Sequence, residues 1–245
     1  MKILATITYD GSMYYGFQKQ KDVRNTIQGI IEEKLSTIFH REIKIYGAGR
    51  TDRYVHASGQ TFHFEVENLK MDLERLKYSL NKMLPDDIVI KDMKIVADDF
   101  HARLSAIGKH YQYRIVTVKN PFYLHYALTY LKKLDFNLLR QGMKLFLGRH
   151  DFYNFCSNND DVDYFETIEK FTLRKSHDTV IFDIYGSGFK RYMVRMIIGT
   201  LLALNEHQIT FDYIKERLDS SHDKVTSYNA PPQGLYLMEV SYDQK

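Results

Sequence analysis

The residues with the clearest chemical potential lie in the segment 47–60, Gly-Ala-Gly-Arg-Thr-Asp-Arg-Tyr-Val-His-Ala-Ser-Gly-Gln. Asp52 stands between Arg50 and Arg53, and the glycines before them allow the backbone to approach closely. A cation within a few ångströms keeps a carboxylate ionised, and an ionised carboxylate can act as a covalent nucleophile. The alternative is a solvated hairpin tip in which Asp52 caps a turn. The loop residues by themselves favour this alternative.

A second segment, residues 109–114, alternates cations and aromatics as Lys-His-Tyr-Gln-Tyr-Arg. On a strand, Tyr111 and Tyr113 point to the same face, where they can stack nucleobases. Packing of both tyrosines in the core of a β-sheet is an equally weighted alternative. The basic-Gly-aromatic-Gly run that is typical of RNA-binding sheet modules is absent around Tyr111.

A third candidate lies on a predicted helix over residues 189–204. Arg191, Arg195 and Gly199 follow one side of it, beside an otherwise apolar surface. A buried Arg195 needs a partner, and an ion pair with Asp52 satisfies both groups. The alternative is an exposed Arg195 whose aliphatic stem covers apolar surface.

Three other chemistries lack their sequence signatures. The stretch Gly-Ser-Gly at 186–188 has Arg191 where a dinucleotide-binding loop needs a third glycine. The ten histidines include no pair at a metal-binding spacing. Cys156, the single cysteine, has no signature that places a base beside it and has no disulfide partner. The sequence therefore predicts neither a metal nor a dinucleotide cofactor.

Composition narrows the class of protein but not its partner. The chain has 245 residues, of which 44% are hydrophobic and 27% charged, as in ordinary globular proteins. Its net charge of +3 is too small to indicate a polyanionic partner, and its 19 tyrosines suit base stacking and sheet cores alike. The longest strongly apolar stretch, residues 196–204, is too short to span a membrane, and no signal peptide is evident. With one cysteine, a reducing, cytoplasmic location is expected.

Apolar periodicity and turn residues predict an α+β protein. The predicted strands are 2–9, 43–46, 60–66, 88–97, 109–118, 167–175, 178–185 and 235–242. The predicted helices are 25–39 with Asn25 as its cap, 72–84 with Asp72 as its cap, 135–147 with Asp135 at its start, 189–204 and 211–218. The first half follows a strand-helix-strand-strand-helix-strand order, and the second half repeats it loosely. This order favours a mostly antiparallel sheet.

A series of motifs in the expected order resembles the tRNA pseudouridine synthase A family. The motifs are Tyr-Asp-Gly-Ser at 9–12, Tyr-Gly-Phe-Gln at 15–18, Gly-Arg-Thr-Asp at 49–52, Val-His-Ala at 55–57 with Gln60, Leu-Pro-Asp-Asp-Ile at 84–88, Asp-Phe-His-Ala-Arg at 99–103, Gly-Arg-His-Asp-Phe at 148–152, Met-Val-Arg at 193–195 and Gly-Leu-Tyr-Leu at 234–237. The resemblance covers essentially the whole chain.

The resemblance implies the pseudouridine synthase fold. This fold is a mostly antiparallel mixed sheet from two ferredoxin-like halves, with helices packed on it and a central active cleft. Residues 1–104 are expected to form the half that carries the loop of Asp52. Residues 105–245 are expected to form the half that carries Tyr111 and Arg195.

The resemblance also implies a cofactor-free isomerase that converts uridine to pseudouridine in the anticodon stem-loop of tRNA. Asp52 matches the family's catalytic aspartate and Tyr111 its active-site tyrosine. Arg195 matches the basic residue paired with that aspartate, and Arg50 an arginine that assists base flipping. Family members form homodimers, with tRNA lying across both subunits. Attack of Asp52 on the ribose and attack on the base both remain open.

The chain departs from the family pattern at Arg53-Tyr54, where a residue of any size is commonly followed by glycine. Replacing that glycine can force a different backbone conformation directly after Asp52. Two rival functions remain, and Tyr54 keeps the second of them open. One is a non-catalytic RNA-binding module that uses the tyrosines of the sheet, and the other is a paralogue that binds tRNA without reacting.

Overall fold

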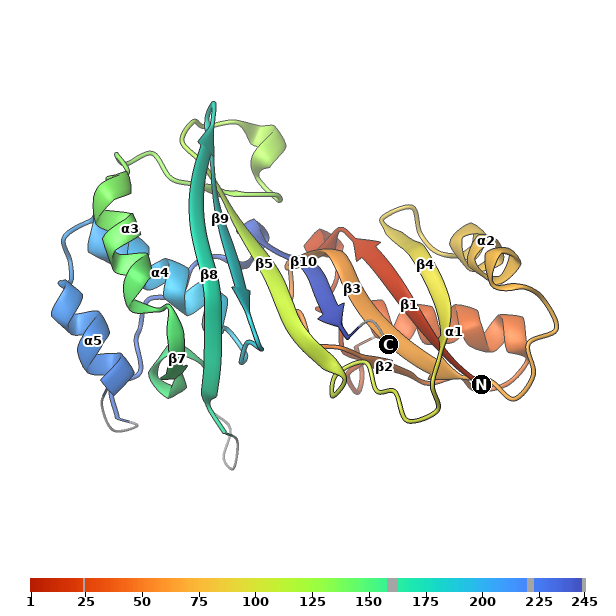
Figure 1. The fold of residues 1–245 in the computed structure, drawn as a ribbon. Coiled ribbons are helices and arrows are strands. Elements are labelled where there is room, and N and C mark those ends of the chain that lie inside the picture. The colour runs from red at the N-terminus through yellow and green to blue at the C-terminus, as the bar shows by residue number, and fades with distance from the viewer. Residues whose placement is uncertain (24, 158–162, 220–222, 244–245) are drawn as a thin grey trace. The chain divides into compact units, whose positions relative to one another are not determined.

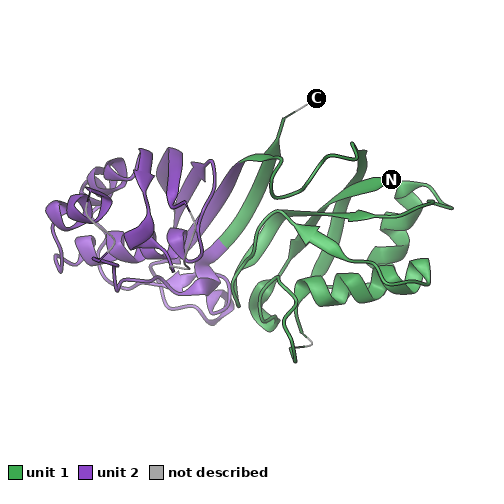
Figure 2. Ribbon diagram, turned by 90° about the horizontal axis from the view of Figure 1, so that it is seen from below, with its two compact units in different colours: residues 1–107, 236–245 green, residues 108–235 purple. Residues whose placement is uncertain are grey.

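The computed structural model describes residues 1–23, 25–157, 163–219 and 223–243. The chain forms an α+β protein with a mixed, mostly antiparallel arrangement of strands (Figure 1). It divides into two compact units: residues 1–107 with 236–245 form unit 1, and residues 108–235 form unit 2 (Figure 2).

Unit 1 has the βαββαβ order of a ferredoxin-like motif. Its elements are β1 (Lys2–Tyr9), α1 (Ile27–Phe39), β2 (Ile45–Gly47), β3 (His56–Glu65), α2 (Leu73–Met83), β4 (Ile88–Val96) and most of β10 (Leu235–Tyr242). The antiparallel strands follow the order β4-β1-β3, and β2 pairs with β3. α1 packs against β2 and α2 against β4, over a core that includes Phe62 and Phe64.

Most strands of unit 2 pair antiparallel with one another. Its elements are β5 (Ala106–Val116), β6 (Leu128–Thr129), α3 (Phe136–Leu145), β7 (Gly148–Asp151), β8 (Phe165–Ser176), β9 (Thr179–Gly186), α4 (Met193–Asn205) and α5 (Phe211–Asp219). The strand order is β5-β9-β8-β7, with β6 parallel to β5. α3 packs on β8, α4 and α5. The sequence did not predict the short strands β6 and β7.

Helix starts follow local capping chemistry, with one correction. Asp72 accepts a hydrogen bond from the Arg75 amide, and the Asp135 side chain caps α3 in the same way, so both predictions are confirmed. The prediction of Asn25 as a cap is wrong, because Thr26 accepts the bond from the Gly29 amide. The Asn25 side chain instead donates to the Met13 carbonyl.

The helix predicted over 189–204 begins later, at Met193. Tyr192 precedes it with a left-handed backbone, φ 65°, so Arg191 lies outside the helix and does not continue the face of Arg195. Every residue of α4 except Arg195 is buried. An apolar helix of this kind is typical of a domain core.

The last strand belongs to unit 1, although the sequence predicted a single half over 105–245. β10 pairs in parallel with β3, with Tyr236 opposite His56 and Leu237 opposite Ala57. A parallel pairing over such a separation leaves no local signal in the sequence. No helix in the described part of the chain is both long and apolar enough to cross a bilayer.

Candidate active site

Asp52 lies on the loop between β2 and β3, and a neighbouring buried residue holds this loop from one side. Thr51 is 6% exposed, and its Oγ1 lies 2.8 Å from the Tyr9 hydroxyl. The Thr51 carbonyl accepts a hydrogen bond of 3.1 Å from the Phe17 amide. A Cβ at Gly16 would come within 2.7 Å of that carbonyl oxygen, so only glycine fits there. The motif at 15–18 thus packs directly against the candidate nucleophile's loop.

The other side of the loop is held from β3. The Gln60 side chain, fully buried, donates to the Gly49 carbonyl at 3.0 Å. Within the loop, the Val55 amide donates to the Asp52 carbonyl at 3.1 Å and closes a tight turn. The Asp52 side chain is half-buried. The turn that the sequence suggested at Asp52 is therefore present. Its closing hydrogen bond joins two backbone groups and does not involve the Asp52 carboxylate.

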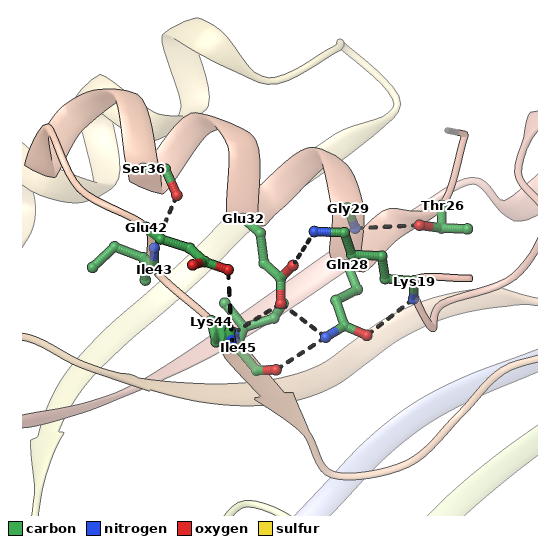
Figure 3. A network of polar contacts seen from close by, with 10 residues as sticks. All are labelled: Lys19, Thr26, Gln28, Gly29, Glu32, Ser36, Glu42, Ile43, Lys44 and Ile45. Atoms are coloured by element: carbon green, nitrogen blue, oxygen red, sulfur yellow. Dashed lines mark hydrogen bonds and ion pairs between the residues drawn. The ribbon is translucent and has the colours of Figure 1, made fainter. Parts of the chain in front are cut away.

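The chain entering the loop is fixed to α1 by the polar network of Figure 3. Glu32, 7% exposed, accepts bonds from the Ile45 amide at 3.1 Å and from the Gln28 side chain at 2.9 Å. Lys19 pairs with the second oxygen of the same carboxylate at 3.1 Å. A buried carboxylate with three partners fixes β2 firmly against the helix.

His56, at the start of β3, has a structural role. It is 2% exposed, its Nδ1 accepts a 3.1 Å bond from the Gly11 amide, and its ring stacks on Tyr236 at 4.5 Å. A Cβ at Gly11 would lie 2.0 Å from the Val55 carbonyl oxygen. The motif residues around 9–12 and 55–57 therefore interlock as backbone contacts that need glycine and histidine.

Tyr54 has a backbone conformation that glycine adopts without strain. Its φ is 68°, in the left-handed region. The guanidinium of Arg53 lies 4.3 Å from the ring centroid of Tyr15 and 4.5 Å from that of Tyr54. Arg50 is exposed on the same loop as Asp52.

Tyr111 and Arg195 belong to unit 2, whereas Asp52 and Arg50 belong to unit 1. Tyr111 is 7% exposed on β5, opposite Ile184, and its ring meets Phe189 edge-on at 5.1 Å. Tyr113, on the same face, is fully buried and donates to the Pro231 carbonyl at 2.7 Å. Core packing is thus the right interpretation for Tyr113.

Arg195 is half-buried and anchored, so an Arg195 whose head is fully in solvent is ruled out. Its Nε donates to the Ala230 carbonyl at 2.8 Å, and its guanidinium lies 5.0 Å from the Tyr192 ring centroid. Burial raises the pKa of Tyr113, and the nearby Arg195 cation partly opposes that rise. Within unit 2, the structure therefore places Arg195 close to the tyrosine face of β5.

A cysteine nucleophile and a metal site both lack support in the described residues. Cys156 is 1% exposed, and burial raises the pKa of its thiol to about 12, so it stays protonated at neutral pH. Across the described ranges, no three His, Cys, Asp or Glu side chains gather in a way that would hold a metal ion.

A family model described as tRNA pseudouridine synthase matches residues 5–104 and 143–243. The chain belongs to the tRNA pseudouridine synthase family. Relatives named tRNA pseudouridine synthase A match nearly the whole length of this chain. The protein from an Exiguobacterium species is 38% identical over 99% of this chain and 98% of its own. The one from Bacillus subtilis is 39% identical over 99% of this chain and 100% of its own. The one from Acetivibrio thermocellus is 41% identical over 96% of this chain and 97% of its own.

This tRNA pseudouridine synthase is an isomerase, as the motif series predicted, and the predicted α+β fold is confirmed as well. The non-catalytic RNA-binding module is therefore set aside. Sequence reasoning missed two residues that contact the candidate site residues or their neighbours, Tyr15 and Tyr192. Tyr15 belongs to the motif at 15–18, which carried no role for it, and the arginine before Tyr192 is too common a neighbour to be diagnostic.

Proposed function

We propose that this synthase converts uridine to pseudouridine in the anticodon stem-loop of tRNA, with Asp52 as the nucleophile and no cofactor. The observation that carries the proposal is the setting of Asp52. Its half-buried carboxylate stands on a loop whose backbone is held by buried Thr51 and Gln60. Arg50 is exposed on the same loop. A fixed, ionised carboxylate is what covalent catalysis requires.

The reaction exchanges one glycosidic bond for another. The target uridine first leaves the base stack, because its glycosidic carbon is not reachable inside a stem. Asp52 forms a covalent bond to the nucleotide, and the N1–C1′ bond breaks with its electron pair leaving on uracil. The uracil rotates, C5 bonds to C1′ and the carboxylate is released. The C5 proton is lost to a base, and N1 gains a proton, so the product is an isomer of the substrate. Addition of the carboxylate to the ribose or to the uracil ring is consistent with this sequence of events.

The proposal gives each remaining candidate a role. Tyr111 packs on the uracil and assists removal of the C5 proton. Arg195 supplies positive charge that keeps Asp52 ionised. Arg50 assists the flipping of the base. The proposal also includes a homodimer that works in the cytoplasm, with tRNA bound across both subunits, and sedimentation velocity of the purified protein tests the dimer.

Tritium release from tRNA labelled at uracil C5 tests the proposal, because only turnover liberates that proton. We expect the parent to release tritium, and primer extension after carbodiimide treatment to locate the new pseudouridines in the anticodon stem-loop. Asp52→Asn is expected to lose about 10⁴-fold or more in turnover. Asp92→Asn, an exposed change in the same unit, is the matched control and is expected to act like the parent. Near-parental turnover by Asp52→Asn would remove Asp52 as the nucleophile.

A further inference from the structure

The segment directly after Asp52 holds a group of side chains that the proposed chemistry does not use. The Arg53 guanidinium contacts the rings of Tyr15 and Tyr54, at 4.3 and 4.5 Å from their centroids. All three residues are exposed, with Tyr15 at 46% and Tyr54 at 37%. We call these three residues the Arg53 cluster.

Arg53 is a cation oriented by aromatic rings rather than by an acid. Among the described residues it makes no ion pair and no side-chain hydrogen bond, and the two tyrosines are its partners. Aromatic contacts engage the faces of a guanidinium and leave the N–H donors along its edge available. Those donors match the oxygens of a phosphate group.

Stability does not account for the cluster. Tyr54 has φ 68°, where a side chain destabilises the backbone and glycine does not. The stabilising free energy of an exposed cation–π contact is no larger than the free-energy cost of this backbone conformation. Tyr15 and Tyr54 also remain 46% and 37% exposed, so neither ring belongs to the core. A glycine at position 54 would therefore serve the fold at least as well.

We propose that the Arg53 cluster binds the RNA strand beside the target uridine, with a tyrosine ring stacking on a neighbouring base and the Arg53 edge binding a phosphate. This inference rests on the proposed function, because it takes Asp52 as the point where the target nucleotide reacts. Two residues span about 7 Å at most, so the backbone of Tyr54 lies within that distance of Asp52.

The chemistry of the substrate favours RNA as the occupant. A uridine that leaves its stack deprives its neighbours of a stacking partner, and an aromatic ring can replace it. Stacking on aromatic side chains accepts any base, and a guanidinium binds any phosphate, so the cluster adds affinity without reading sequence. A partner protein or a second copy of the chain is the competing occupant, and the test includes it.

Tyr54→Gly is the central variant, because glycine suits the observed φ and removes only the ring. In tritium-release assays with tRNA we expect KM to rise about 10-fold, within the range for loss of one stacked base, and kcat to change far less. Tyr54→Phe retains the ring and is expected to restore KM to within about 3-fold of the parent, since stacking needs no hydroxyl. Tyr78→Ala is the matched control, because Tyr78 is 64% exposed in unit 1 and lies near Lys82 in a similar contact.

Arg53→Gln tests the phosphate contact separately. In the Asp52→Asn background, filter binding of tRNA at several salt concentrations gives the slope of log K against log salt. Loss of one phosphate contact is expected to reduce the magnitude of that slope by about 0.7–0.9. Arg53→Lys retains the charge and is expected to retain the slope.

The outcomes separate the inference from the function it rests on. A parent enzyme without Asp52-dependent tritium release would overturn both. Normal turnover by the parent, with parental KM and salt slope in Tyr54→Gly and Arg53→Gln, would overturn the inference alone. A change of molar mass in light scattering without a change in tRNA affinity would also overturn it, in favour of a protein partner. Melting temperatures near the parent value are expected for every variant.

Discussion

The segments that carry Asp52 and Arg195 each contain a left-handed tyrosine next to an arginine, but they are held in different ways. Tyr54 and Tyr192 have φ values of 68° and 65°. The loop of Asp52 is anchored through the side chains of Thr51 and Gln60. At the start of α4, the side chain of Arg195 is itself an anchor, because it donates to the Ala230 carbonyl.

The two segments therefore differ in whether the residue proposed for the reaction also stabilises the fold. In unit 1 the proposed nucleophile and the loop's main anchors are different residues, so a change at Asp52 can remove the reaction without loss of the fold. In unit 2 the proposed charge partner also binds a buried carbonyl, since Ala230 is 2% exposed. Changes at Arg195 must therefore affect both properties.

The largest combined effect is expected from Arg195→Gln. Turnover in the tritium assay should fall by about 10²–10³-fold, as for removal of one charge-stabilising donor. The free energy of unfolding should also fall by about 1–3 kcal/mol, because the Ala230 carbonyl loses its charged donor. Urea denaturation measures this second effect. Asp52→Asn is the comparison variant, expected to lose turnover while its unfolding midpoint stays at the parent value. Parental stability in Arg195→Gln would contradict the anchoring role.

Acid should destabilise the two units in different pH ranges. His63 is 2% exposed, and burial, with help from His101 and Lys2, lowers its pKa to about 4. It is neutral in the folded state at neutral pH, so the unfolded chain binds more protons as the pH falls through 6.5, and unit 1 should lose about 2–3 kcal/mol between pH 6.5 and 4. Burial raises the pKa of Asp183 in unit 2, but hydrogen bonds from Gln112, His110 and Arg174 outweigh it and lower the pKa overall. The stabilisation from Asp183 is thus lost only below about pH 4.

Hydrogen exchange resolved by peptide checks this order. Between pH 6.5 and 4.5, after correction for intrinsic rates, protection should fall in unit 1 and hold in unit 2. His63→Gln retains an acceptor for the Ala102 amide, which donates to Nδ1 of His63 at 3.1 Å, and should remove most of the acid sensitivity. Equal acid sensitivity in parent and variant would exclude His63 as its source.

A smaller effect is expected from Thr51→Val, which keeps the shape of the anchor and removes its hydroxyl. Loss of the 2.8 Å bond to Tyr9 should cost about 1 kcal/mol of unfolding free energy. Turnover should fall about 10-fold, since a small displacement of the nucleophile is costly. Thr8→Val, which removes a 2.9 Å bond from a half-buried hydroxyl on the same strand as Tyr9, is the control for turnover. Unchanged turnover in Thr51→Val would mean that the loop keeps its position without this bond.

The smallest expected effect is the difference in unfolding free energy between Tyr54→Gly and Tyr192→Gly. Tyr54→Gly relieves the left-handed strain of an exposed residue, so unfolding free energy should stay within about 0.5 kcal/mol of the parent or rise. Tyr192→Gly relieves similar strain but removes a half-buried ring that contacts Arg191 and Arg195, and should destabilise by about 1 kcal/mol. Urea denaturation measures both changes in unfolding free energy. Equal changes would contradict the proposed difference between the two segments.

Local chemistry in the sequence determined most of the elements. Alternation of apolar residues located β1, β8, β9 and β10, and aspartates located the starts of α2 and α3. The motif series determined the family. The loop residues by themselves favoured a turn at Asp52, and only the motif series singled this residue out as a nucleophile.

Tertiary structure decided what depends on distant partners. The return of β10 to unit 1 comes from pairing with β3, and the position of Arg195 comes from a carbonyl 35 residues later in the chain. The same holds for the contact between Tyr15 and Arg53 and for the burial of Tyr113. Spacing along a chain reports only on neighbours within a turn or a strand. Contacts between distant segments depend on how the whole chain packs, because only packing determines which groups lose water together.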